Sequence, residues 1–402
     1  MRTRYGISPW IDTFPRSRRP DYPRLRGELT ANVAIIGGGL TGCATAYACA
    51  VAGLKPLLIE ANRLGQGSAG RGAGLLLPEP GPSFKDVTAR HGLRAARLIF
   101  ESWRRASLDS AALIRRLKIS CGLDACDHIA VAPRDGKALR REYEARHAAG
   151  LDAQWVTPAI VRRTTALEAP GGLRLRASFT LDPHRACLGL AAAAKSRGAA
   201  FFERSRATQV RAAAKHVEIE VAGGLVRAQT VIVCTGTATS EFKPLRRHFK
   251  PREQYFVVTE PVPAAIRKQL AGRDVTISDT ESPRHQVRWT RDDRLLVAGA
   301  TQDETPPKKR DAVLVQRTGQ LMYELLMMNS AISGLQPEYG WDGAYGETTD
   351  GIMYIGPHRN YPRHLFALGG DSLSGAFLAA RVLARAVSGQ SGKHDEVFGW
   401  TR

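Results

Sequence analysis

Two short apolar runs near the start of the chain, separated by a stretch of small residues, form its clearest pattern. Residues 31–36 (ANVAII) and 55–60 (KPLLIE) are mostly apolar, which is the pattern of strands buried on both faces. Between them, residues 40–53 (LTGCATAYACAVAG) are small and apolar, which is typical of a helix that packs closely against a sheet. The pattern predicts a β–α–β unit over residues 31–61.

Helical and strand patterns alternate along the rest of the chain. In chain order they predict two helices in 84–118, a strand pair in 122–135, a solvated helix in 141–151, a helix and a strand in 184–203, a hairpin and a buried strand in 207–236, four strands in 251–300, a helix in 314–329, and a strand, glycine loop and helix in 365–389. Strands that alternate with helices over 402 residues indicate an α/β fold with a large core.

The turn between the first strand and its helix is a GxGxxG sequence carried by Gly37, Gly39 and Gly42. The first glycine allows a tight turn, the second lets the backbone approach a pyrophosphate, and the third lets helix and strand pack closely. At the start of the helix, Leu40 and Thr41 then offer free N–H groups and the positive end of the helix dipole to phosphates.

Glu60, at the end of the second strand, completes a dinucleotide-binding pattern. It lies 18 residues after Gly42, where a carboxylate can accept a hydrogen bond from a ribose hydroxyl. An acid at this place disfavours a 2′-phosphate, so NAD or FAD is expected rather than NADP.

Two more glycine loops follow, GQGSAGRGAG at 65–74 and GGDSLSG at 369–375. The last one opens a helix, whose free N–H groups can stabilise partial negative charge on a ring or carbonyl. Three glycine loops, near both ends of the chain, indicate one extended ligand held along its length. This favours FAD over NAD, because the isoalloxazine ring of FAD lies far from its adenine.

Four motifs together resemble the FAD-dependent oxidoreductases of the D-amino acid oxidase superfamily, in the branch of glycine, sarcosine and γ-glutamylputrescine oxidases. They are VAIIGGGLTG with LLIE, GQGSAGRGAG, VIVCTG (231–236), and the stretch from Trp341 to Gly356 with LFALGGDSLSGAFLAAR. The resemblance covers roughly residues 30 to 390. Two positions depart from it: Gly72 stands where Asn is common, and Met353 stands where Pro is usual.

The resemblance implies a discontinuous Rossmann-like FAD-binding domain with a mixed-sheet substrate domain inserted into it. The FAD-binding domain would comprise residues 31–82, 151–245 and 336–402, after an N-terminal extension of residues 1–30. The substrate domain would comprise residues 83–150 and 246–335.

The resemblance also assigns FAD contacts residue by residue. Gly37, Gly39 and Gly42 would hold the pyrophosphate and Glu60 the ribose, while Ala207 and Gly236 would meet the adenosine end. Ser68 and Arg71 would lie along the pyrophosphate and the ring. The closing loop would face the pyrimidine edge of the flavin through Gly369, Gly370, Asp371, Ser372 and Leu373.

The implied reaction removes a hydride from the carbon beside an amine nitrogen, with the flavin as acceptor. A substrate carboxylate would need an arginine fork, for which Arg288 in HQVRWT is the first candidate and Arg252 the second. A sheet-edge or surface role for Arg288 stays open. Tyr255 and Trp289 are candidates for the pocket wall, although core packing explains each equally well.

Three further expectations concern the cofactor chemistry. The strand RLLVAGAT (294–301) lacks the lysine found near the flavin in many oxidases, so the electron acceptor is left open between oxygen and a protein. Arg71 stands close to the place where some relatives attach FAD through a histidine, so a non-covalent flavin is expected. His285 is a weaker candidate for a base, and no Cys/His cluster has metal-ligand spacing.

Two alternatives to a small-molecule enzyme stay open, and the formal net charge of +20 bears on the first of them. One is an FAD oxidase of the same fold that modifies tRNA, although nucleic acid is not the favoured partner, since the arginines are spread along the whole chain. The other is the flavin subunit of a hetero-oligomeric amino acid dehydrogenase. No apolar run is long enough to span a membrane and residues 1–30 lack a signal-peptide pattern, so a cytoplasmic protein is expected.

Overall fold

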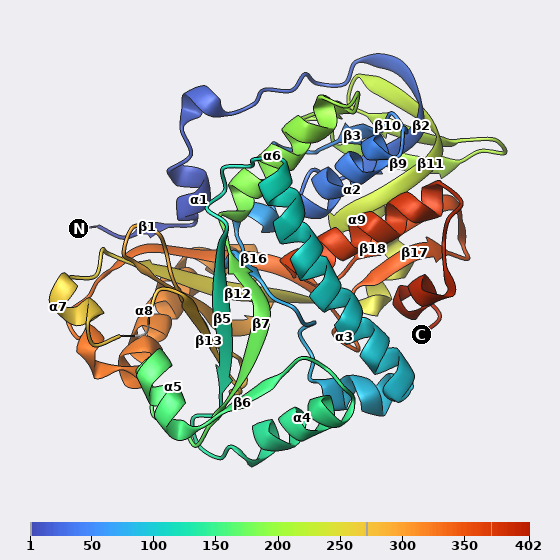
Figure 1. Cartoon of the computed structure of the whole chain (residues 1–402). Helices are drawn as coiled ribbons and strands as arrows, with labels where there is room; N and C mark the ends of the chain where they lie inside the picture. Colours follow the sequence, from blue (N-terminus) through green and yellow to red (C-terminus); the bar gives the residue numbers. More distant parts are fainter. Residues whose placement is uncertain (1, 271, 371) are drawn as a thin grey trace.

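The computed structural model describes residues 2–270, 272–370 and 372–402. Within these ranges the strands form two mixed sheets, one of eight strands and one of ten. In Figure 1 the eight-stranded sheet lies at the upper right with helices α2, α6 and α9. The ten-stranded sheet lies below it, with α5, α7 and α8 at its outer side. The expected α/β fold class is confirmed.

The eight-stranded sheet begins with the predicted β–α–β unit. Its strands are β2 (Gly27–Ile36), β3 (Leu57–Ile59), β8 (Ala200–Phe202), β9 (Ala207–Ala212), β10 (Val217–Val221), β11 (Gly224–Gly236), β17 (Tyr354–His358) and β18 (Tyr361–Leu368). The main order is β17-β18-β11-β2-β3-β8, and β2 pairs in parallel with both β3 and β11. β18 pairs in parallel with β11, so the end of the chain returns beside its beginning.

Three helices cover one face of this sheet. They are rich in small residues, which lets them pack closely against its apolar strands. These are α2 (Leu40–Val51), α6 (Pro183–Lys195) and α9 (Leu373–Val387), and α2 packs against both of the others. Alanines such as Ala44, Ala191 and Ala379 are fully or almost fully buried in the shared core. On the opposite face, β9 and β10 cover a second core that contains Val233 and Phe366.

The ten-stranded sheet carries the other half of the molecule. Its strands are β1 (Arg4–Tyr5), β4 (Leu75–Leu76), β5 (Asp124–Val131), β6 (Gln154–Val156), β7 (Gly172–Thr180), β12 (Phe249–Thr259), β13 (Val275–Asp279), β14 (Gln286–Trp289), β15 (Leu295–Asp303) and β16 (Pro337–Thr348). β12 lies between β15 and β16 and alternates its side chains between two cores. Tyr255 packs with α8 (Arg310–Met328), and Phe256 stacks on Trp341 on the other face.

The remaining helices are α1 (Pro9–Asp12), α3 (Phe84–Arg116), α4 (Lys137–Ala148), α5 (Pro158–Thr165) and α7 (Ala264–Arg267). The backbone of α3 leaves the helical region at Gly92 (φ 79°, ψ 160°), so it consists of two helices, as predicted. Residues 122–135 contain one strand, β5, instead of the predicted pair. α4 was expected to be solvated, and most of its side chains are exposed or half-buried, but Glu142 and Arg146 are buried and form an ion pair, and Arg146 also pairs with Glu79.

The two sheets do not follow the residue ranges expected for the two domains. β4, β6, β7 and β16 fall in the ranges assigned to FAD binding, yet all four pair within the ten-stranded sheet. The reason is that the chain crosses between the two sheets several times within these ranges, and the four family motifs do not mark the crossings. The proposed division into domains stays a prediction.

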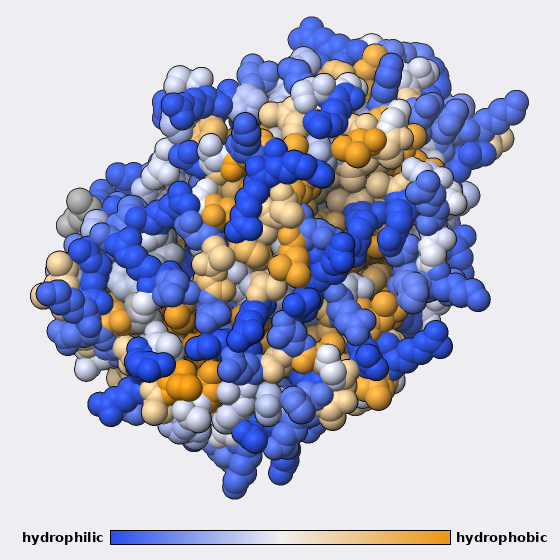
Figure 2. Space-filling model, in the orientation of Figure 1, coloured by the Kyte–Doolittle hydropathy of each residue, from blue (hydrophilic) through white to orange (hydrophobic). Residues whose placement is uncertain are grey.

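The N-terminal extension is docked rather than loose. Trp10, Tyr22 and Leu25 are buried, and β1 pairs with β16. Figure 2 shows one face that is mostly hydrophilic, with paler and orange apolar side chains near its middle. None of the helices in the described part of the chain combines the length and apolar character that crossing a bilayer requires.

Candidate functional site

A cavity of about 1200 Å³ is lined by residues from both sheets. One end is formed by the first glycine turn and by β11, and the other by β12, β14, β15 and β16 of the ten-stranded sheet. Its lining residues extend from Ile36 to Ala376, so distant parts of the chain share one enclosure. A continuous space of this size can hold an extended ligand together with a smaller one.

The first glycine turn is shaped by close backbone contacts. A Cβ on Gly42 would lie 1.9 Å from the carbonyl oxygen of Gly37, and one on Gly37 would lie 2.5 Å from the carbonyl oxygen of Cys234. Gly37 also has a φ of 108°, which few other residues adopt. At Gly39 a Cβ would meet nothing within 4 Å, which leaves open space for a ligand beside the backbone. Gly42 shapes the turn from beneath, whereas Gly37 and Gly39 line the cavity.

The N-terminus of α2 faces this open space. No side chain caps it, and Leu40 and Thr41 line the cavity, so the N–H groups of the first turn are left for a ligand. Glu60 lines the cavity at the end of β3 and accepts hydrogen bonds from the backbone N–H groups of Gly38 and Asn62, each at 2.7 Å. Each carboxylate oxygen has two acceptor sites, so Glu60 retains capacity for a ribose hydroxyl.

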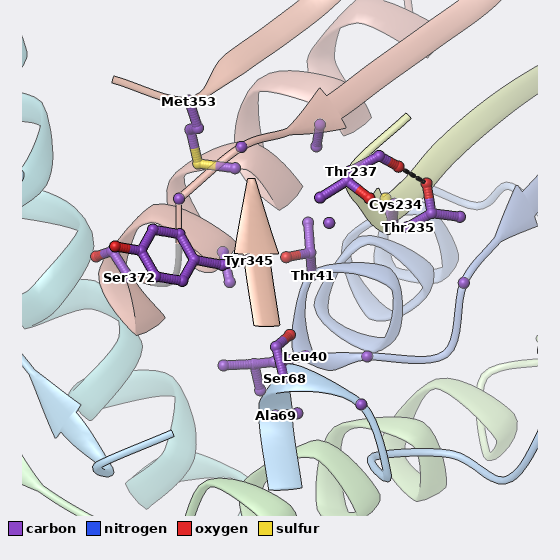
Figure 3. Close-up of a pocket in the computed structure, with 18 of the residues that line it drawn as sticks. Leu40, Thr41, Ser68, Ala69, Cys234, Thr235, Thr237, Tyr345, Met353 and Ser372 are labelled. Carbon is purple, nitrogen blue, oxygen red and sulfur yellow. Dashed lines mark hydrogen bonds between the residues drawn. The ribbon is translucent and has the colours of Figure 1, made fainter. Parts of the chain in front are cut away.

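Ala207 and Gly236 also line the cavity, on the β9 and β11 side. In Figure 3 Thr235 and Thr237 lie next to Cys234, and the hydroxyl of Thr235 donates to the carbonyl oxygen of Thr237 at 2.7 Å. The structure therefore brings the residues expected at the adenosine end together around one wall.

The second glycine loop contributes Ser68 but not Arg71 to the cavity lining. The Nη1 of Arg71 donates to the carbonyl oxygen of Asp342 at 3.0 Å and lies 3.5 Å from its carboxylate. The carbonyl oxygen of Arg71 accepts from Trp341 Nε1 at 2.8 Å. Arg71 was expected along the pyrophosphate and ring, but its side chain lies outside the cavity lining. The contacts with Asp342 hold the Arg71 side chain against β16.

The closing glycine loop lines the cavity through Gly369, Gly370, Ser372 and Leu373. Gly369 has a φ of 90° and donates to the carbonyl oxygen of Gly236 at 2.8 Å, which joins this loop to the end of β11. Ser372 caps α9 by accepting from the N–H of Gly375 at 3.1 Å. Asp371, also expected near the flavin, lies outside the described residues.

The other end of the cavity is a polar face of the ten-stranded sheet. It presents long or hydrogen-bonding side chains from adjacent strands, namely Arg252, Gln254, Gln286, Thr301, Tyr345 and Glu347. Arg252 forms ion pairs with Asp303 at 2.5 Å and with Glu347 at 3.3 Å. Partial burial lowers the pKa of Arg252, but these pairs outweigh it and raise the pKa overall, so the side chain stays cationic.

A loop at 280–285 contributes to the cavity lining beside this polar face. Glu281 and Arg284 line the cavity, and Arg284 is exposed there. The loop is anchored by His285, which is buried and contacts Asp279 at 2.6 Å through Nδ1 and Glu324 at 2.9 Å through Nε2. Burial lowers the pKa of His285, but the two carboxylates raise it overall to about 9, so the imidazole is protonated at neutral pH. A protonated ring that bridges two carboxylates holds the loop and is not poised as a base.

Two of the three candidate catalytic residues lie elsewhere. Arg288 is buried away from the large cavity, and its guanidinium donates to the carbonyl oxygens of Gly74 and Leu181. Tyr255 is buried on the α8 side of β12, where its hydroxyl donates to Glu253 at 2.7 Å. Trp289 also lies outside the cavity lining, within the core beneath α8. The placement supports the packing interpretation for all three, and only Arg252 reaches the cavity.

Several cavity residues were not singled out by the sequence, among them Trp103, Tyr345, Thr235 and Thr237. Trp103 on α3 reaches the closing loop and donates to the hydroxyl of Ser372 at 3.2 Å. Figure 3 shows Met353, Tyr345 and Ser372 on one side of the space and Cys234, Thr235 and Thr237 on the other. These side chains come from segments far apart in the chain, so local patterns do not reveal that they share a cavity. Three lining residues, Gln254, Gln286 and Thr301, could be identified from the alternation of side chains along β12, β14 and β15. This requires the strand register, which the sequence does not give.

The thiol of Cys234 lines the same space but is not a nucleophile. Burial raises the pKa of Cys234 to about 12, so the reactive thiolate is not populated at neutral pH. No histidine or lysine is found among the described residues that line the cavity.

The sequence pattern of the family described as FAD dependent oxidoreductase (DAO) matches residues 32–386. The chain belongs to this family. Its cofactor is FAD, and the structure fits it, because Gly39 leaves open space beside the backbone and the N-terminus of α2 has no side-chain cap. The predicted family and cofactor are confirmed.

Named enzymes resemble the chain in sequence, and a solved structure resembles it in fold. It is 24% identical over 383 residues to γ-glutamylputrescine oxidoreductase of Escherichia coli (strain K12), covering 93% of this chain and 87% of that protein. It is 25% identical over 353 residues to glycine oxidase of Bacillus licheniformis, covering 83% and 86% of the two chains. The crystal structure of glycine oxidase from Geobacillus kaustophilus superposes with a TM-score of 0.77 at 19% identity, covering 93% of this chain and 99% of that one. That structural likeness confirms the fold.

Proposed function

We propose that this enzyme oxidises the C–N bond of an amino acid, or of an N-substituted amino acid, to an imine by hydride transfer to FAD. The observation that carries the proposal is that one continuous cavity joins a dinucleotide cradle at Gly37–Thr41 to a polar sheet face with charges of both signs. Names of relatives such as glycine oxidase and γ-glutamylputrescine oxidoreductase support the amine chemistry.

When bound, FAD supplies the hydride acceptor, and the protein has to position the substrate against it. A zwitterionic substrate matches the sheet face. We infer that the exposed guanidinium of Arg284, together with Arg252, binds the substrate carboxylate. Glu347, at 3.3 Å from Arg252, is placed to accept from the substrate nitrogen. Gln254 and Gln286 then offer hydrogen bonds that fix the orientation of the substrate.

The nitrogen must shed its extra proton before the adjacent carbon can lose a hydride. Glu347 is the acidic side chain on the sheet face that can hold that proton at its carboxylate oxygen. No separate triad is required, because proton removal from nitrogen occurs readily once an acceptor is within hydrogen-bond reach.

Anaerobic reduction of the purified flavoprotein tests the proposal. Amino acids, N-methyl amino acids and polyamines are added one at a time, and loss of the flavin absorbance is followed. Bleaching by members of the first two groups, and slower or no bleaching by polyamines without a carboxylate, supports the proposed substrate class. Bleaching by none of the three groups contradicts the proposed reaction.

Admitting air to the reduced enzyme then separates the two possible electron acceptors. The described residues that line the cavity include no lysine. The strand RLLVAGAT, which carries a lysine near the flavin in many oxidases, contributes Thr301 to the lining. We propose that reoxidation by air is slow and that an electron-accepting protein is the partner. Fast reoxidation, within a few turnover times, would instead identify an oxidase.

We also propose that the flavin is held without a covalent bond. The cavity offers no histidine among its described lining residues, and the Cys234 thiol is protonated. Acid precipitation is expected to leave a colourless pellet and a yellow supernatant. A yellow pellet that survives washing would contradict this.

A further inference from the structure

A second cavity of about 1160 Å³ lies apart from the FAD site. It is bordered by the N-terminal extension, the end of α3, the start of α6 and the hairpin between β14 and β15. These elements meet near the left centre of Figure 1, where β1 and α1 approach the upper end of β5. Its residues are not shared with the large cavity, so it is a separate space.

The charge of this second cavity is not balanced. Eight arginine or lysine side chains and five acidic ones line it. Four of the acids are already in ion pairs with arginines of the same lining, and only the exposed Asp274 lacks one among the described residues. Three cations have no ion pair within the described part of the chain, namely Arg288, Arg115 and Lys118.

Arg288 is the uncommon member of this set, because it is only 4% exposed. Its two Nη atoms donate to carbonyl oxygens at 3.1 and 3.3 Å, and its Nε has no hydrogen-bond partner among the described residues. Burial lowers the pKa of Arg288 to about 10, which still leaves it protonated at neutral pH. Nearby Asp182 and Asp124 are paired with other arginines, so the charge of Arg288 is not neutralised by a carboxylate of its own.

A buried cation without a counter-ion is costly, and the cost falls when an anion binds beside it. Arg115 and Lys118, at the end of α3, are exposed on the same cavity, and Arg115 lies over the ring of Phe179 at 5.5 Å. They place positive charge at the mouth, while Arg288 places it at the floor. The guanidinium of Arg288 lies over the ring of Trp10 at 5.2 Å, and Trp10 lines the same space.

We propose that this second cavity binds a small molecule through an oxyanion, a phosphate or a carboxylate, held between Arg288, Arg115 and Lys118. The site is separate from the amine oxidation proposed above and does not depend on it. Guanidinium groups bind such oxyanions through paired, charge-assisted hydrogen bonds, which are stronger than those between neutral groups.

The test uses the FAD-loaded enzyme at constant ionic strength, so that non-specific screening does not change. Inorganic phosphate, malonate and adenosine monophosphate are titrated separately by calorimetry, and thermal unfolding is recorded at saturation. Saturable binding with a raised Tm is expected for at least one of them. Binding of phosphate but not malonate identifies a phosphate site, the reverse identifies a carboxylate site, and tighter binding of the nucleotide shows that the organic body contributes.

Two double variants separate a built site from general basicity. Arg115→Ala with Lys118→Ala is expected to weaken binding about tenfold, because two charges at the mouth are lost. Arg94→Ala with Arg116→Ala is the matched control: both residues are exposed on α3, neither lines the cavity, and the change in net charge is the same. The control is expected to bind as the parent does.

Arg288→Gln tests the floor of the site and should abolish binding while leaving the flavin spectrum unchanged. If this buried variant does not fold, the comparison of the two double variants still decides the question. Absence of saturable binding of all three probes, or equal weakening by both double variants, would overturn the proposal.

Discussion

The two ends of the large cavity are formed by different kinds of atoms, main-chain atoms at one end and side-chain atoms at the other. The cofactor end is made of backbone: Gly37 and Gly42 are in contact with main-chain oxygens, and Gly39 faces open space. The sheet end is made of long side chains, and Arg252 is held there by Asp303 and Glu347. Function at the first end depends on side chains being absent, whereas at the second it depends on which charges are paired and which are left free.

The comparison predicts the largest effect at Gly42. In Gly42→Val the new Cβ would lie 1.9 Å from the carbonyl oxygen of Gly37, and neither backbone segment can give way cheaply. We expect a loss of about 3 kcal/mol or more in the free energy of unfolding, and loss of bound FAD. Flavin content after purification and urea unfolding measure both.

Gly39→Ala is the matched change in the same turn. Its Cβ would meet no protein atom within 4 Å, and the φ of −76° suits alanine, so stability should be unchanged. The methyl group would instead enter the space in which the pyrophosphate is expected, and FAD affinity alone should fall. If Gly39→Ala binds FAD as well as the parent enzyme does, the assigned pyrophosphate position is wrong.

At the sheet end we expect a smaller and more selective effect. Arg284→Met should raise KM for an amino acid substrate about 30-fold, because one charged partner of the carboxylate is lost, which corresponds to about 2 kcal/mol. Flavin content and the absorbance spectrum should not change. Arg163→Met on α5, an exposed arginine outside the cavity, is the control. Equal KM values for the two variants would remove Arg284 from the substrate site.

The anchor of the 280–285 loop makes the sheet end sensitive to alkali. The folded pKa of His285 is about 9, above the ordinary value of 6.5, so its contribution to stability is complete below pH 6.5 and lost as the pH rises through 9. We expect roughly 3 kcal/mol less stability from this group at pH 9.5 than at pH 6.

Urea unfolding at these two pH values measures the effect. His285→Gln should flatten the pH difference, whereas His394→Gln, at an exposed histidine, should preserve it. A parent enzyme whose stability does not fall between pH 6 and 9.5 would show that the imidazole is not protonated in its place.

The smallest effect is expected at Arg71, which sequence motifs placed on the cofactor and the structure places on Asp342. Arg71→Met should cost about 1 kcal/mol of stability, because the ion pair is partly exposed and Asp342 keeps a second pair with Arg310. FAD affinity should be unchanged. A strong loss of FAD with unaltered stability would return Arg71 to the cofactor.

The same contrast explains which features the sequence predicts. The glycine turn, the helix after it and Glu60 lie within 24 residues, from Gly37 to Glu60, and each requires a particular residue type for a local physical reason. Their placement in the cavity could therefore be predicted from spacing alone. Strands and most helices follow for the same reason, from the apolar period of each segment.

The substrate end depends on register and on partners that are distant in the chain. Arg288 and Tyr255 stand on the correct sheet, but Arg288 reaches toward Leu181 and Tyr255 faces α8. Nothing near Arg288 in the sequence shows that Gly74 and Leu181 supply its acceptors. Likewise, one of the two buried ion pairs of α4 joins Arg146 to Glu79, 67 residues earlier in the chain, so the composition of the helix alone does not reveal its burial.

The parallel pairing of β18 with β11 has a consequence for how the enzyme is made. During synthesis the glycine turn and β2 leave the ribosome more than 300 residues before Gly369, Gly370 and Leu373 do. FAD that meets the nascent protein finds a cradle without its opposite wall. We therefore expect cofactor loading to wait until β18 and the closing loop have been added, and a product that stops before β18 would leave the cradle open.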